Sequence, residues 1–160
     1  MTSLEFKIFV AAAKQIGAPY VWCGKGERLW SPSGPLSSSF KFKVFDCSGL
    51  VTFAFRQAGL KDATMIHNAK SLYRKLKPLR GGSSVFLEAH PALAFYGKDE
   101  DSIDHVAIIF SLYGTMMLLE AGGGGRTTLS PTPGAAVRMA VPKRTDLIGL
   151  RMFPESDTDL

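Results

Sequence analysis

The spacing of apolar residues changes about halfway along the chain, and this change constrains the fold more than any other feature. Residues 4–16, 48–58 and 67–76 carry apolar side chains at the spacing of a helix. A glycine or a proline follows each of these segments closely, as is typical where a helix ends. The first half of the chain is therefore predicted to be mainly helical.

The second half consists of short apolar segments separated by glycine, proline or aspartate, which is typical of antiparallel strands. These segments are SSVFLEA, DHVAIIFSL, GTMMLLEA, AAVRMAV and LIGLRMF. Helices followed by strands predict an α+β fold. We expect the N-terminal helices to pack on one face of a curved antiparallel sheet of about five or six strands.

Length and composition indicate one domain over residues 1–160. Apolar residues make up 46% of the chain and charged residues 21%, which is the balance of an ordinary globular protein. The polar stretch from Gly24 to Ser39 is expected to be a surface loop, and the acidic residues 155–160 a frayed tail.

The charge pattern narrows the class of partner. The net charge is +5, but the basic residues are scattered, so we expect weak attraction to polyanions and no nucleic-acid recognition. No apolar run reaches the roughly 18 residues that span a bilayer. Glu5, Lys7 and Lys14 interrupt the N-terminal apolar run, which argues against a secretory signal. A soluble protein without a membrane partner is expected, and its oligomeric state is open.

The chain has two cysteines, Cys23 and Cys47, which lack the spacing of a zinc site and are too few for a disulfide framework. A disulfide between them has little support, and no metal or cofactor is expected. Cys47 follows Asp46 at the start of a predicted helix, where unpaired N–H groups favour a thiolate. The same place suits a small buried residue, so helix position alone leaves both interpretations open.

A thiolate nucleophile needs a base within hydrogen-bonding reach. His67 and His90 are expected to be hydrogen-bonded surface residues. His105 begins the most apolar predicted strand, HVAIIF, where a rigid scaffold would hold an imidazole in place. His105 is therefore the candidate base.

Glu120 is the candidate for the group that orients His105. A hairpin centred between Leu112 and Tyr113 would place Glu120 directly opposite His105, with Cβ atoms roughly 4.5–5.5 Å apart. A carboxylate there would fix the imidazole tautomer and stabilise its protonated form. The prediction depends on register, because a slip of one residue turns Glu120 to the other face. The alternative is a surface carboxylate at a strand end.

The segments GAPYVW, FDCSGLVTFAFRQAG and HVAIIF followed by MMLLEAGG resemble, in this order, the NlpC/p60-type family of papain-like cell-wall cysteine peptidases. DCSGL before an apolar helix is the most specific part of the likeness. The resemblance implies a papain-like half-size fold and hydrolysis of peptidoglycan stem peptides, typically at the bond from D-γ-glutamate to a diamino acid. It implies that Cys47 is the nucleophile, His105 the base and then acid, and Glu120 the third member.

The resemblance also implies binding roles for three residues. Tyr20 matches a tyrosine that lines the cleft near the oxyanion, and Asp46 and Ser48 match positions that hold the free amino end of the stem peptide. A carboxylate suits an ammonium group as an acceptor.

Several features depart from the family pattern. Glu120 stands where the family usually has a histidine, and Cys23 where it has a glycine. The stretch from Gly24 to Ser39, which carries Trp30, is longer than the family needs. The family strand motif Gly-Asp-Leu-Val-Phe-Phe has its only counterpart in GSSVFLEA.

Two rival functions stay open beside a peptidoglycan peptidase. The same Cys–His pair could serve an amidase or acyltransferase on another substrate, or the chain could be a catalytically silent binding module such as part of a phage tail. Cys47, His105 and Glu120 together argue against the silent module. Without an export signal, we expect a phage lysin, a tail hydrolase or a delivered effector that meets the wall after lysis or delivery, and otherwise a cytoplasmic protein.

Overall fold

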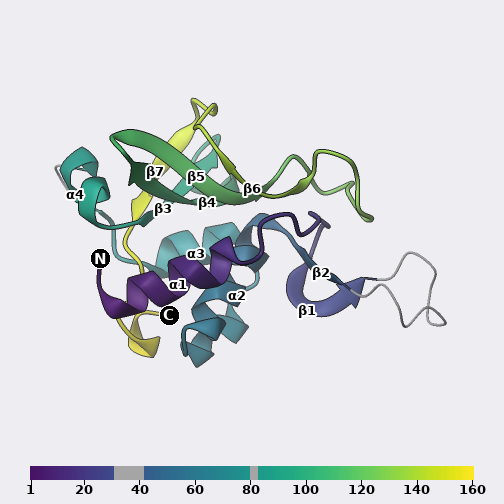
Figure 1. Ribbon diagram of the computed structural model, residues 1–160, viewed down its shortest axis with the longest axis horizontal. Coiled ribbons are helices and arrows are strands. Elements are labelled where there is room, and N and C mark those ends of the chain that lie inside the picture. Colours follow the sequence, from purple (N-terminus) through teal and green to yellow (C-terminus); the bar gives the residue numbers. More distant parts are fainter. Residues whose placement is uncertain (31–41, 80–82) are drawn as a thin grey trace.

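The computed structural model describes residues 1–30, 42–79 and 83–160, and its largest element there is an antiparallel sheet (Figure 1). The strand order is β6-β5-β4-β3-β7. The five strands are β3 (Ala92–Gly97), β4 (Ile103–Leu112), β5 (Thr115–Gly122), β6 (Ala136–Ala140) and β7 (Leu147–Arg151). β1 (Lys25–Trp30) and β2 (Phe42–Phe45) form a separate antiparallel pair beside the N-terminal helices.

Of the helices that precede the five-stranded sheet in sequence, three lie together below it in Figure 1: α1 (Ser3–Ala13), α2 (Cys47–Gln57) and α3 (Ala69–Lys75). Each begins at a capping side chain, because Thr2, Asp46 and Asn68 accept hydrogen bonds from backbone amides of the first turn. The α+β prediction, with N-terminal helices on one face of a five-stranded sheet, is confirmed.

Strand β4 lies at the centre of the sheet and contributes to two cores. Val106 and Ile108 face helices α1, α2 and α3 and are fully buried in the core that these helices share with the sheet. Ala107 and Ile109 face the opposite side, where they pack with Leu87 of α4 (Ser83–Ala89). Burial on both faces accounts for the nearly continuous apolar sequence of this strand.

The structure corrects the prediction that SSVFLEA is a strand, because these residues form helix α4. In a strand, Val85 and Leu87 would lie on one face, whereas Val85 is 70% exposed and Leu87 is 5% exposed. The strand in this part of the chain is β3, which lies just after His90 and Pro91 and was not predicted. GSSVFLEA is therefore no counterpart of the family's strand motif.

The structure also differs from the predicted surface loop and from the predicted frayed C-terminal tail. Residues 25–30 of the expected surface loop form β1, while residues 31–39 lie outside the described part of the chain. The C-terminal residues are packed rather than frayed: Leu160 is buried in the main core, and Asp159 pairs with Lys77 at 2.9 Å. None of the helices in the described ranges is long and apolar enough to cross a membrane.

Candidate active site

Cys47 is the first residue of α2, and its neighbours hold it there firmly. The preceding Asp46 caps the helix through a 2.6 Å hydrogen bond from the Gly49 amide to its Oδ1. The apolar residues that follow Cys47 in α2 are buried, which anchors the helix in the core. The Cys47 thiol is 7% exposed and donates a long hydrogen bond, with 3.9 Å between Sγ and oxygen, to the carbonyl of Asp104.

A cleft of about 820 Å³ opens at this end of α2, between the helix, the start of β4 and the segment after β5. Five of the six predicted site residues line it: Tyr20, Asp46, Cys47, Ser48 and His105. Glu120 lines a neighbouring hollow of about 370 Å³, which His105 shares with the cleft. The structure therefore gathers all six predicted residues around His105 and Cys47.

His105 and Glu120 form a short hydrogen bond, with 2.7 Å between Nε2 and Oε2. Because Glu120 occupies Nε2, the nitrogen left for the thiol of Cys47 is Nδ1. Tyr96 lies beside the imidazole, with ring centroids 5.9 Å apart. Glu120 thus holds one side of the imidazole, and Cys47 is close enough to raise the pKa of His105, which is the order that nucleophile activation requires.

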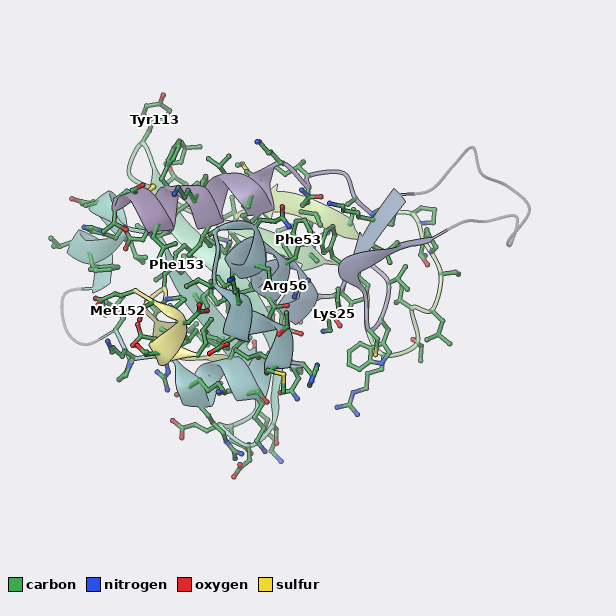
Figure 2. All side chains as sticks on the ribbon, turned by 90° about the horizontal axis from the view of Figure 1, so that it is seen from below. Lys25, Phe53, Arg56, Tyr113, Met152 and Phe153 are labelled. Carbon is green, nitrogen blue, oxygen red and sulfur yellow. The ribbon has the colours of Figure 1, made fainter. Side chains whose placement is uncertain are left out.

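The hairpin register differs from the prediction by two residues. The turn is formed by Tyr113 and Gly114, so that Leu112 pairs with Thr115 and the exposed Tyr113 projects from the tip (Figure 2). Both turn residues have positive φ, 50° and 80°, as in the mirror-image turns that suit two-residue hairpins. Glu120 therefore lies diagonally from His105 rather than directly opposite, but on the same face.

Arg138 holds the other oxygen of Glu120. Its Nη2 and Nε lie 3.1 and 3.2 Å from Oε1, and β6 places Arg138 directly opposite Glu120. Burial raises the pKa of Glu120, but the bonds from His105 and Arg138 outweigh it and keep that pKa below the usual range. Glu120 is therefore a carboxylate, although it is 7% exposed.

The same interactions favour a charged His105. Burial lowers the pKa of His105, but the interactions with Cys47 and with the Glu120 carboxylate outweigh it and raise the pKa to about 9. At neutral pH the imidazole consequently carries a proton that it can give to a leaving group.

Tyr20 forms one wall of the cleft. Its backbone amide bonds to the Ala135 carbonyl at 2.9 Å, which fixes the residue against the segment before β6. Burial, with added repulsion from Cys47 and Asp46, raises the pKa of Tyr20 far above its usual value, so the hydroxyl keeps its proton. A Cβ on Gly124 would overlap the Tyr20 ring, so glycine is required where this loop crosses the tyrosine.

Asp46 and Ser48 line the cleft, but a cation of the chain itself holds them. Lys25 Nζ lies 2.9 and 2.8 Å from the two carboxylate oxygens of Asp46 and 3.0 Å from Ser48 Oγ. Figure 2 shows Lys25 close to Arg56 of α2, whose Nη2 donates to the Lys25 carbonyl at 2.9 Å. Nothing in the sequence pattern of residues 24–30 indicates this contact.

The two other histidines and Cys23 differ in whether they line the cleft. His90 bonds to Glu5 through Nδ1 at 2.9 Å and stacks on Phe86, which is a structural arrangement. His67 is exposed and lines the cleft, a position that its sequence context does not reveal. Cys23 also lines the cleft, and both it and Cys47 are free thiols. Among the described residues, no group of three or more His, Cys, Asp or Glu side chains could hold a metal ion.

Comparison with known proteins identifies the family. The model of the NlpC/P60 family matches residues 17–140. The peptidoglycan endopeptidase RipB of Mycobacterium tuberculosis is 31% identical over 121 residues, which make up 75% of this chain and 44% of RipB. The chain thus spans less than half the length of this relative.

Solved structures give the same fold. RipD of Mycobacterium tuberculosis, described as a non-catalytic NlpC/p60 domain protein adapted to peptidoglycan binding, aligns with a TM-score of 0.62 at 19% identity, over 96% of this chain and 98% of RipD. A structure of RipA, the Resuscitation Promoting Factor Interacting protein, aligns with a TM-score of 0.58 at 25% identity, over 93% of this chain and 61% of that one. RipA structures carry mutations at a cysteine, a histidine and a glutamate.

Proposed function

The chain belongs to the NlpC/P60 family, and from this premise we propose that it is a cysteine peptidase that hydrolyses peptidoglycan stem peptides. The observation that carries the proposal is the arrangement of Cys47, His105 and Glu120, with the imidazole held 2.7 Å from the carboxylate at the edge of the cleft. The bond that the resemblance implies, from D-γ-glutamate to a diamino acid, is the proposed point of cleavage.

In the proposed reaction, the Cys47 thiolate attacks the carbonyl carbon of the γ-glutamyl amide. A thiolate at the first residue of α2 is stabilised by the positive end of the helix dipole. The imidazolium of His105 gives its proton to the departing amine, leaving a thioester on Cys47. His105 then takes a proton from water, which attacks the thioester and releases the γ-carboxylate.

The oxyanion formed in these steps needs hydrogen-bond donors. The first N–H groups of a helix have no partner within the helix, and those of α2 lie next to the sulfur. The Tyr20 hydroxyl, which keeps its proton, is the proposed second donor from the opposite wall of the cleft.

Two rival functions predict other outcomes. An amidase or acyltransferase would use the same Cys47 and His105 on a different carbonyl. A binding module would use the cleft without turnover, and RipD, a non-catalytic NlpC/p60 domain protein adapted to peptidoglycan binding, is an example on this fold. The bond from His105 to Glu120 favours catalysis over binding alone, because binding alone does not need an oriented base.

The decisive experiment incubates purified peptidoglycan and defined stem peptides with the wild-type protein and with Cys47→Ala, and identifies products by mass spectrometry. Cleavage between D-γ-glutamate and the diamino acid, lost in Cys47→Ala, is the expected result. Cleavage at the amide between sugar and peptide would favour an amidase. Binding of peptidoglycan without turnover by either protein would favour the binding module.

The route to the cell wall stays a prediction. RipB and RipD are proteins of Mycobacterium tuberculosis, and neither gives support to a phage lysin or tail hydrolase. We propose only that the protein meets the wall after lysis or delivery. Detection of the protein in fractions of its native host would test this.

A further inference from the structure

The contact between Lys25 and the Asp46–Ser48 pair uses the full donor capacity of the lysine. An ammonium group has three hydrogens, and Lys25 Nζ has three acceptors within 3.0 Å: both carboxylate oxygens of Asp46 and the hydroxyl of Ser48. The main chain of Lys25 is also held, because it pairs with Phe45 in the β1–β2 ladder and accepts a bond from Arg56. This ammonium is therefore part of the folded structure.

The carboxylate of Asp46 is correspondingly engaged. It is 5% exposed, and it accepts bonds from the Gly49 amide at 2.6 Å and the Ser48 hydroxyl at 3.1 Å, besides those from Lys25. A buried carboxylate without a cation would attract an ammonium group strongly. With Lys25 in place, the pair carries no net charge, and a second ammonium beside it would be repelled by the first.

The rest of the cleft shows the same balance of charge. Asp101 pairs with Lys70 at 3.2 Å, and Asp104 pairs with Arg144 at 2.9 Å. Arg126 lies over the ring of Trp22, and no carboxylate in the described part of the chain pairs with it. Each acidic side chain that lines the cleft is thus paired with a cation of the chain itself, although Asp104 shares Arg144 with Asp146.

We propose that Lys25 determines specificity by satisfying Asp46 and Ser48 internally, so that the cleft does not select a free amino end. The substrates that fit are stem peptides whose first residue is acylated, as it is when the stem is still joined to the glycan by an amide bond. This inference rests on the proposed function, and it replaces the ammonium-binding role that the resemblance implies for Asp46 and Ser48.

The test compares kcat/KM for one stem peptide with a free amino end and for the same peptide N-acetylated at that end. The wild-type protein is expected to cleave the acetylated peptide at least as well as the free one. Lys25→Met keeps the aliphatic chain but removes the ammonium, and it is expected to shift the ratio at least tenfold toward the free peptide. In Lys25→Met combined with Asp46→Asn, both charges are gone, and the ratio is expected to return toward the wild-type value.

Two controls separate specificity from folding. Lys77→Met also removes a Lys–Asp ion pair, the one with Asp159, and is expected to leave the ratio unchanged. Asparagine caps helices as well as aspartate does, so the double variant keeps the start of α2. Melting temperatures from circular dichroism establish that each variant is folded.

A wild-type preference of tenfold or more for the free peptide would overturn the proposal, as would an unchanged ratio in Lys25→Met. If the wild-type protein cleaves neither peptide, the proposed function fails. The same two peptides are then titrated into Cys47→Ser by calorimetry, and the ratio of their Kd values, with and without Lys25→Met, decides the role of Lys25 by the same criteria.

Discussion

Replacing Glu120 with glutamine removes the charge from its bond to His105 and keeps the size of the side chain. The bond is 2.7 Å long and nearly excluded from solvent, since Glu120 is 7% exposed. A hydrogen bond to a charged group is worth roughly 1.5–3 kcal/mol. Since about 1.4 kcal/mol corresponds to a factor of ten in rate, we expect kcat/KM to fall roughly 10- to 150-fold.

The same substitution should change the pH dependence. Burial opposes the charge on His105, but Cys47 and Glu120 outweigh it and raise its pKa to about 9. The imidazolium that protonates the leaving amine is lost as pH rises through the pKa of His105, so wild-type activity should decline near pH 9. Glutamine removes one of the two groups that raise this pKa, so the decline should begin at lower pH. Rates on a defined stem peptide across neutral and alkaline pH measure both effects.

Arg138→Gln is the matched control, because it breaks the ion pair on the other oxygen of Glu120 and leaves the bond to His105. The Arg138 side chain is 44% exposed, and an exposed ion pair is worth about 0.2–1 kcal/mol, which is at most roughly a fivefold effect on rate. A Glu120→Gln protein with the wild-type rate and an unmoved alkaline limb would refute the reasoning and remove Glu120 from the mechanism.

Three substitutions test how the site is built. Asp46→Ala removes the helix cap on the Gly49 amide, which is worth roughly 0.5–2 kcal/mol, and it also leaves the Lys25 ammonium without its carboxylate, so urea unfolding should show a loss of at least the value of the cap. Gly49→Ala would place a Cβ against the carbonyl oxygen of Gly24, and the overpacking should cost roughly 1–3 kcal/mol, seen as a lower melting temperature. Gly124→Ala would overlap the Tyr20 ring in the wall of the cleft. Expressed as a free energy, its effect on kcat/KM should therefore be larger than its effect on the free energy of unfolding. A wild-type urea midpoint for Asp46→Ala, a wild-type melting temperature for Gly49→Ala, or a wild-type rate for Gly124→Ala would contradict these assignments.

The parts of the fold that the sequence predicts well are long and strongly patterned. The helix that begins at Cys47 and the β4–β5 hairpin each combine a clear apolar period with a defined end. SSVFLEA is too short for its period to distinguish a strand from a helix, and its assignment failed. The six residues Ala92–Gly97 are apolar throughout and become a strand because both faces are covered.

The candidate site likewise contains some residues that the sequence predicts and others that it does not. Cys47 and His105 are predictable because each stands at the start of an element whose position follows from local pattern. The contacts of Lys25 and Arg138 depend on how separate elements meet. Lys25 is 21 residues from Asp46, and Arg138 meets Glu120 across a long loop whose sequence sets no register.

The contact between His105 and Glu120 was predicted with a register that is wrong by two residues, and the geometry of strands explains why the prediction still held. Side chains alternate between faces, so an error of two leaves Glu120 on the face of His105, whereas an error of one would have brought the buried Leu119 there. The pairing Ile108–Leu119, extended by three residues along both strands, places Gly122 opposite His105. A Cβ on Gly122 would lie 2.5 Å from Glu120 Oε1, so the carboxylate occupies the space that a side chain would fill. A diagonal pair spans roughly 7–8 Å between strands, a distance that suits the length of a glutamate. The orienting carboxylate is therefore built from two residues together, a glutamate that reaches across and a glycine that makes room for it.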